Sequence, residues 1–150
     1  MRLYIDLNCF NRPFDDQSQE RIRLETHAVL GILTRIVEGK DALLWSWVLS
    51  FENSKHPKPE RRDEIAIWER RSQQSVALSS EVQERARGIV QIGIKALDAA
   101  HLASVEAGRA EIFLTCDDVI VRRAATAGLS LRVLNPVAYF EEVTGNGETA

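Results

Sequence analysis

The 150-residue chain contains only two cysteines, Cys9 and Cys116, which form neither a metal-ligand spacing nor a disulfide framework. Two free thiols fit a reducing compartment. No apolar run approaches the roughly 20 residues needed to cross a bilayer. The N-terminus carries one positive charge followed by an aspartate, which is unlike a secretory signal. We therefore expect a cytoplasmic protein with no membrane segment.

The chain also lacks a basic surplus, an internal repeat and a glycine-rich phosphate loop. Its formal net charge is −3, whereas nucleic-acid-binding proteins usually carry a positive surplus. The missing phosphate loop argues against a nucleotide-driven switch. The paired acids of a phospho-receiver domain are absent after the first apolar run. A composition of 45% hydrophobic and 27% charged residues is typical of one globular domain.

Short apolar runs alternate with segments of helical period along the whole sequence. The runs predict strands at 2–5, 42–46, 76–78, 111–115 and 131–134. The periodic segments predict helices at about 17–38, 48–54, 60–72, 80–90, 94–108, 118–128 and 136–143. This alternation predicts an α/β fold, with a mostly parallel sheet covered by helices on both faces. We expect one domain over residues 1–143 and a flexible tail over 144–150.

Four carboxylates stand where parallel strands would deliver them to one edge of the sheet. Asp6 follows the first predicted strand and Asp117 follows the fourth. Glu52 lies on the short helix after the second strand, and Asp98 opens a later apolar helix. Taken singly, each acid also fits an ordinary role: a turn residue, a helix N-cap, a solvated helix residue or an acid favoured by the helix dipole.

Four carboxylates brought together repel one another, and in low dielectric some would protonate. A divalent cation removes this conflict, and oxygen ligands suit Mg²⁺ or Mn²⁺. Such a site activates water and stabilises an oxyanion in phosphoryl chemistry. We expect Asp6 and Asp117 nearest the ion, with Asp98 as a further ligand. Glu52 would complete the pocket, where a second ion or an oriented water is also compatible with the pattern.

The order of five motifs resembles that of the PIN-domain nuclease family, whose members include VapC-type toxins. These motifs are LYIDLNCF, SFEN, IKALDAAHLA, IFLTCDDVIVRRA and VLNP. The resemblance implies a three-layer α/β/α fold with sheet order 3-2-1-4-5, and metal-dependent RNA cleavage, usually by a homodimer. It implies catalytic roles for Asp6, Glu52, Asp98 and Asp117, with Asn8 and Thr115 as polar neighbours. Leu7 departs from the hydroxyl residue that often follows the first aspartate.

Two residues beside these acids have open roles. The Thr-x-Asp match selects Asp117, and Asp118 then falls in the first helical turn as a back-up ligand at best. His101 lies three residues after Asp98 and shares its helix face. It either touches the site or packs as a buried, hydrogen-bonded histidine, and the sequence favours packing.

Without the four proposed site acids, the formal charge of −3 becomes +1. A basic cluster follows the second acid and can guide an RNA backbone, or can form a solvated face: Lys55, Lys58, Arg61 and Arg62. The sequence thus predicts a Mg²⁺- or Mn²⁺-dependent ribonuclease, with an antitoxin protein as partner if it is a toxin. The alternative is a non-catalytic PIN-fold module that binds RNA or protein. Core packing is the expected role for most of the tryptophans, with a dimer contact as the alternative.

Overall fold

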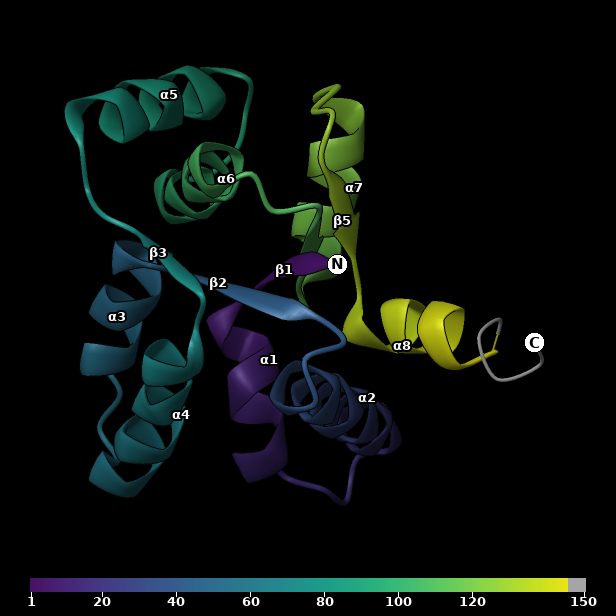
Figure 1. The fold of residues 1–150 in the computed structure, drawn as a ribbon. Helices are drawn as coiled ribbons and strands as arrows, with labels where there is room; N and C mark the ends of the chain where they lie inside the picture. Colours follow the sequence, from purple (N-terminus) through teal and green to yellow (C-terminus); the bar gives the residue numbers. More distant parts are fainter. Residues whose placement is uncertain (146–150) are drawn as a thin grey trace.

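Five parallel strands form the centre of the computed structural model, which describes residues 1–145 (Figure 1). They are β1 (Arg2–Ile5), β2 (Ala42–Ser46), β3 (Gln74–Val76), β4 (Ile112–Leu114) and β5 (Arg132–Leu134). Their order in the sheet is β3-β2-β1-β4-β5, and every pairing is parallel. The predicted α/β class and strand order are confirmed.

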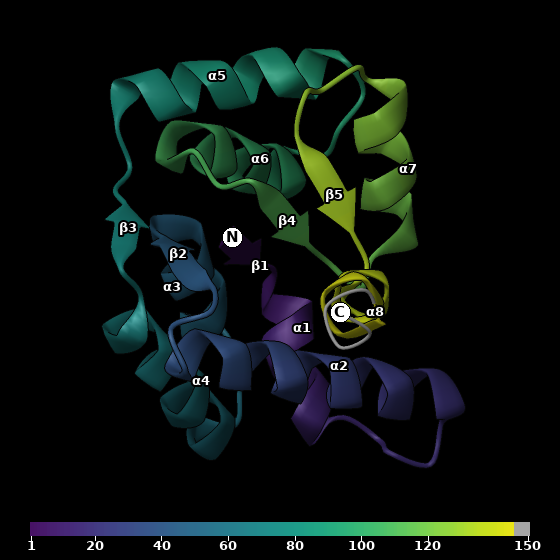
Figure 2. The same ribbon diagram turned by 45° about the vertical axis from the view of Figure 1, so that its right-hand side comes forward.

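Helices cover both faces of this sheet, as its buried strands require. They are α1 (Leu7–Asn11), α2 (Glu20–Val37), α3 (Trp47–Ser54), α4 (Pro59–Arg71), α5 (Ser80–Gln91), α6 (Ala96–Gly108), α7 (Asp118–Thr126) and α8 (Pro136–Gly145), with a 3₁₀ turn, η1 (Arg12–Phe14). Figure 2 shows α6 against one face with α5 outside it, and α1 and α2 on the opposite face. The molecule therefore has the expected three layers.

Three elements differ from the sequence prediction. The third strand was expected at 76–78 but occupies Gln74–Val76, because β2 pairs with it in the register Leu44↔Gln74. Helix α1 was not predicted, and it begins directly after Asp6. The last helix extends to Gly145, two residues into the segment expected as a tail. The rest of that segment, 146–150, lies outside the described residues.

Gly39 and Gly108, both expected to end a helix, take different positions. Gly39 follows α2 with a φ of 78°, the left-handed conformation of the predicted cap. Gly108 was also expected to stop its helix, but it is the last residue of α6, and Arg109 takes the positive φ of 57°. A Cβ at Gly108 would overlap the side chain of Leu44. Gly108 therefore permits α6 to lie close against β2.

The central strands carry the core. β4 and the last three residues of β1 are buried, and Trp45 on β2 is 1% exposed. Trp68 is partly buried and packs against this core. These two tryptophans thus have the packing role that the sequence favoured. Among residues 1–145, no helix combines the length and the apolarity of a membrane span.

Candidate active site

The carboxyl ends of β1 and β4 bring Asp6 and Thr115 together. The two strands pair directly, and the backbone N–H of Asp6 donates to the carbonyl of Leu114 at 2.9 Å. The sheet order reverses between these strands, so both residues lie at the switch point where open α/β sheets bind ligands.

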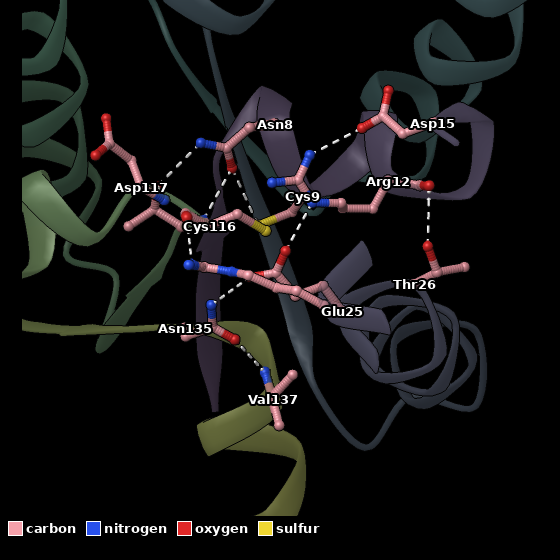
Figure 3. A network of polar contacts seen from close by, with 12 residues as sticks. Asn8, Cys9, Arg12, Asp15, Glu25, Thr26, Cys116, Asp117, Asn135 and Val137 are labelled. Carbon is pink, nitrogen blue, oxygen red and sulfur yellow. Dashed lines mark hydrogen bonds and ion pairs between the residues drawn. The ribbon is translucent and has the colours of Figure 1, made fainter. Parts of the chain in front are cut away.

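Asn8 and Thr115 hold the Asp6 carboxylate. The Thr115 hydroxyl donates to Asp6 Oδ2 at 2.8 Å, and the Asn8 amide nitrogen donates to the same oxygen at 3.2 Å. Asn8 Oδ1 accepts from the backbone N–H of Cys116 at 3.1 Å, which ties α1 to the turn after β4 (Figure 3). Because both side-chain bonds go to Oδ2, they leave Oδ1 directed toward the other site residues.

His101 on α6 links Asp6 to Glu52. Its Nε2 contacts Glu52 Oε1 directly and lies 3.9 Å from Asp6 Oδ1. On the other side of the ring, Nδ1 is 2.6 Å from the hydroxyl of Tyr4, which in turn is 2.6 Å from Ser46 Oγ. His101 is 1% exposed, so it is both a packed histidine and a member of the acidic site. The oxygen-only site expected from the sequence omitted this nitrogen.

Glu52 and Asp98 reach the site from two different helices. Ser46 caps α3 by accepting from the Leu49 N–H at 3.3 Å, and Glu52 follows on that helix, half-buried. Asp98 lies in the first turn of α6. Burial raises the pKa of Asp98, and the negative charges of Asp6 and Asp117 raise it further. Asp98 is therefore within electrostatic reach of both strand-end aspartates.

Asp117 has the capping role that the sequence allowed for it. It is the N-cap of α7, and its Oδ1 accepts from the N–H groups of Val119 at 2.9 Å and Ile120 at 3.4 Å. Its own N–H donates to the Thr115 hydroxyl at 3.1 Å. These bonds orient the carboxylate without using Oδ2, so capping is compatible with a ligand role.

Asp118 is bound by the side chain of Arg21 and not by the acids of the site. Both of its carboxylate oxygens accept from the Arg21 guanidinium at 2.8 Å. This bidentate bond lowers the pKa of Asp118, whose side chain is 54% exposed. The two adjacent aspartates therefore differ. Asp117 is half-buried at the site, and Asp118 forms an exposed ion pair with Arg21.

A second buried acid, Glu25 on α2, binds residues from three segments next to the site. It accepts from Arg12 Nε at 2.8 Å, Arg21 Nε at 3.2 Å and Asn135 Nδ2 at 2.6 Å (Figure 3). Burial alone would raise the pKa of Glu25, but these three bonds lower it overall. Sequence reasoning missed Glu25, whose only signal is a charge on the otherwise apolar face of α2.

The electrostatics of the cluster favour a cation. Burial raises the pKa of Asp6, and the charge of Glu52 adds to this effect, although His101 and the Thr115 hydroxyl oppose it. One ligand atom from each of Asp6, Glu52 and His101 lies within 4.8 Å of the others. These three residues fit a single divalent ion, with Asp98 and Asp117 nearby to bind water or a second ion.

The four basic residues after Glu52 divide into two pairs. Arg61 donates to Asp15 at 3.3 Å and to the Phe14 carbonyl at 3.0 Å, and Arg62 donates to the His56 carbonyl at 2.7 Å. These guanidinium groups are therefore used in holding α4 against its neighbours. Lys55 and Lys58 are exposed.

The two cysteines also lie close together beside the site. Cys9 Sγ and Cys116 Sγ are 3.7 Å apart, and both are buried free thiols.

No protein-family model and no curated protein matches the chain. Solved structures do match. One is a chain of FitAcB from Neisseria gonorrhoeae, with a TM-score of 0.57 and 15% identity over 89% of this chain and 97% of that chain. Another is a chain of VapBC2 from Rickettsia felis bound to a DNA fragment from its promoter, with a TM-score of 0.58 and 16% identity over 90% of this chain and 98% of that chain. The strand order and these matches show that the chain shares the fold of the matched chains, the PIN-like fold expected from the sequence.

Proposed function

We propose that the protein is an endoribonuclease that requires Mg²⁺ or Mn²⁺ and hydrolyses RNA phosphodiester bonds. The observation that carries this proposal is the convergence of Asp6, Glu52 and His101, with Asp98 in electrostatic reach, at the switch point of a PIN-like sheet. Asp6 is buried and Glu52 and Asp98 are half-buried, and a bound cation would relieve the repulsion between acids held this close together.

The residues of the chain divide the chemistry between them. Asp6 and Glu52 would hold the ion, and Asn8 and Thr115 keep the Asp6 carboxylate in place. Asp98 and Asp117 would orient the attacking water or hold a second ion. When bound, the ion supplies Lewis acidity that lowers the pKa of water and stabilises charge on the phosphate.

RNA as substrate and an antitoxin as partner form the finer part of the proposal. The matched structures are FitAcB and VapBC2, the second with promoter DNA. By analogy, we propose that this chain is a toxin whose partner is a small DNA-binding antitoxin, and that it acts as a homodimer in the cytoplasm. Lys55 and Lys58 are the exposed members of the basic cluster and the candidates for guiding the RNA backbone.

Cleavage of RNA with Mg²⁺ or Mn²⁺, and its loss with a chelator, tests the activity. We expect Asp6→Asn and Asp98→Asn to abolish it. Asp117→Asn should reduce the rate by about 10²–10³-fold, the cost of removing a group that stabilises transition-state charge. Asp118→Asn is the matched control on the same turn and should stay within about threefold, since its carboxylate binds Arg21.

Unchanged cleavage by Asp6→Asn and Asp98→Asn would refute the proposal. RNA binding without any metal-dependent cleavage would instead support a non-catalytic regulatory module. Copurification with the product of a neighbouring gene tests the antitoxin partner, and sedimentation tests the homodimer.

A further inference from the structure

A chain of hydrogen bonds lies behind the His101 ring, on the side away from Glu52. The Tyr4 hydroxyl has one proton and lies 2.6 Å from two groups, His101 Nδ1 and Ser46 Oγ. If Nδ1–H donates to the Tyr4 oxygen, the Tyr4 proton goes to Ser46, and Nε2 presents a lone pair to the site. A metal-binding histidine typically donates its other ring N–H to an oxygen in this way.

The opposite side of the ring meets two carboxylates. His101 Nε2 contacts Glu52 Oε1 and lies 3.9 Å from Asp6 Oδ1. Ligand atoms about 2.1 Å from one ion are about 3 to 4 Å apart in an octahedron. A lone pair on Nε2 and an anionic oxygen repel each other unless a proton or a cation lies between them. His101 Nε2 and Glu52 Oε1 are closer than two ligands of one ion, so the contact itself holds a proton. A cation bound by both groups would displace this proton, and the ligand atoms of Asp6, Glu52 and His101 all lie within 4.8 Å of one another.

We propose that His101 is a nitrogen ligand of the bound ion, together with Asp6 and Glu52. The site then has mixed nitrogen and oxygen ligation, and it favours Mn²⁺ or a similar transition-metal ion over Mg²⁺, which prefers oxygen. This inference rests on the proposed metal-dependent function, but it concerns the identity of the ligands and not the reaction. Tyr4 is a positioning residue, because it holds the ring from behind through Nδ1.

Pulsed electron paramagnetic resonance of the full chain loaded with Mn²⁺ alone tests the ligand. A directly bound imidazole gives a ¹⁴N coupling, which should change to a ¹⁵N coupling when the protein is grown with ¹⁵N-histidine. The chain has three histidines, and the coupling should disappear in His101→Gln but persist in His27→Gln and His56→Gln. His27 packs against Phe140 and His56 accepts from the Lys58 N–H, both outside the site.

Titration calorimetry with Mn²⁺ and Mg²⁺ provides a test that does not alter the ligand. Tyr4→Phe removes the oxygen behind Nδ1 and should weaken Mn²⁺ binding about 10–100-fold, with a smaller loss for Mg²⁺. Equal losses for both ions would show that Tyr4 acts only on the fold, and would overturn the selectivity.

The outcomes separate this inference from the proposed function. A ¹⁴N coupling in a protein that does not cleave RNA would support the ligand and refute the function. RNA cleavage by a Mn²⁺ protein with only water and carboxylate couplings would refute the ligand and leave the function standing. Failure of the chain to bind Mn²⁺ at all would also overturn the inference.

Discussion

Replacing Asp6 by asparagine should change stability in opposite directions with and without a divalent ion. In the metal-free protein, the carboxylates of Asp6 and Glu52 lie within 4.8 Å of each other. Two unit charges 4.8 Å apart repel by about 3.5 kcal/mol at an effective dielectric constant of about 20. His101 offsets part of this repulsion, and an asparagine oxygen can still accept from Thr115. We expect Asp6→Asn to raise the free energy of unfolding by about 1–2 kcal/mol at pH 7.

The pH dependence of stability independently predicts that Asp6→Asn stabilises the metal-free protein. Burial raises the pKa of Asp6, so its protonated form is favoured in the folded state. The wild type therefore loses stability as the pH rises through this raised pKa. Below the ordinary pKa of an aspartate, Asp6 is protonated in both the folded and the unfolded chain, and this loss of stability is absent. The advantage of Asp6→Asn should be largest at neutral pH and shrink as the pH falls.

Manganese should reverse the order of stability. At a Mn²⁺ concentration about 100 times the wild-type Kd, binding adds about 2.7 kcal/mol to the wild type. A variant that binds about 100-fold more weakly gains only about 0.4 kcal/mol under the same conditions. The difference of about 2.3 kcal/mol exceeds the gain expected for metal-free Asp6→Asn.

Urea unfolding followed by circular dichroism, with chelator or with Mn²⁺, measures both effects. Asp118→Asn is the control, because it removes one surface acid paired to Arg21. It should change stability by less than about 1 kcal/mol and leave the Mn²⁺ effect intact. Equal stabilisation of wild type and Asp6→Asn by Mn²⁺ would refute the assignment of Asp6 as a ligand.

Three further predictions concern the fold and the substrate. Gly108→Ala should destabilise the protein by about 1–3 kcal/mol through overpacking against β2. Gly88→Ala on α5, where a Cβ would meet only the Arg85 side chain at 3.9 Å, should stabilise it by about 0.5–1 kcal/mol; thermal unfolding compares the two variants. Glu25→Ala should lower the free energy of unfolding by about 2–3 kcal/mol at pH 7. This is less than the cost of breaking a fully buried ion pair, because the arginines that bind Glu25 are partly exposed. That cost should fall as the pH drops through the lowered pKa of Glu25, as urea unfolding at several pH values will show. Removing both Lys55 and Lys58 should lower the salt slope of RNA affinity by about one per lost phosphate contact, measured by fluorescence anisotropy.

Much of the fold was predictable because local signals and packing agree. The apolar run at β1 and the helical period of α2 predicted these two elements correctly, because each pattern reflects the face that is buried in the fold. The third strand was predicted two residues late because Gln74 and Ser75 are polar and exposed, and their strand character comes from pairing with β2. Backbone hydrogen bonding decided that position, and side-chain pattern could not reveal it.

The candidate site was predictable only in part. Strand ends marked Asp6 and Asp117, because a parallel sheet delivers its carboxyl ends to one edge. The position of His101 was visible from its spacing to Asp98, but the direction of its ring depends on Tyr4, which lies 97 residues away in sequence. Arg61 and Arg62 read as a basic surface, yet their guanidinium groups bind nearby backbone carbonyls, a use that charge patterning does not reveal.

The hydrogen bond between Thr115 and Asp6 also fixes when the site can exist during protein synthesis. The two residues are 109 positions apart, so the first aspartate leaves the ribosome long before its partner is made. At about 5–20 residues per second, this interval lasts about 5–20 s. A nascent chain of this protein therefore carries an incomplete site until Thr115 has been made.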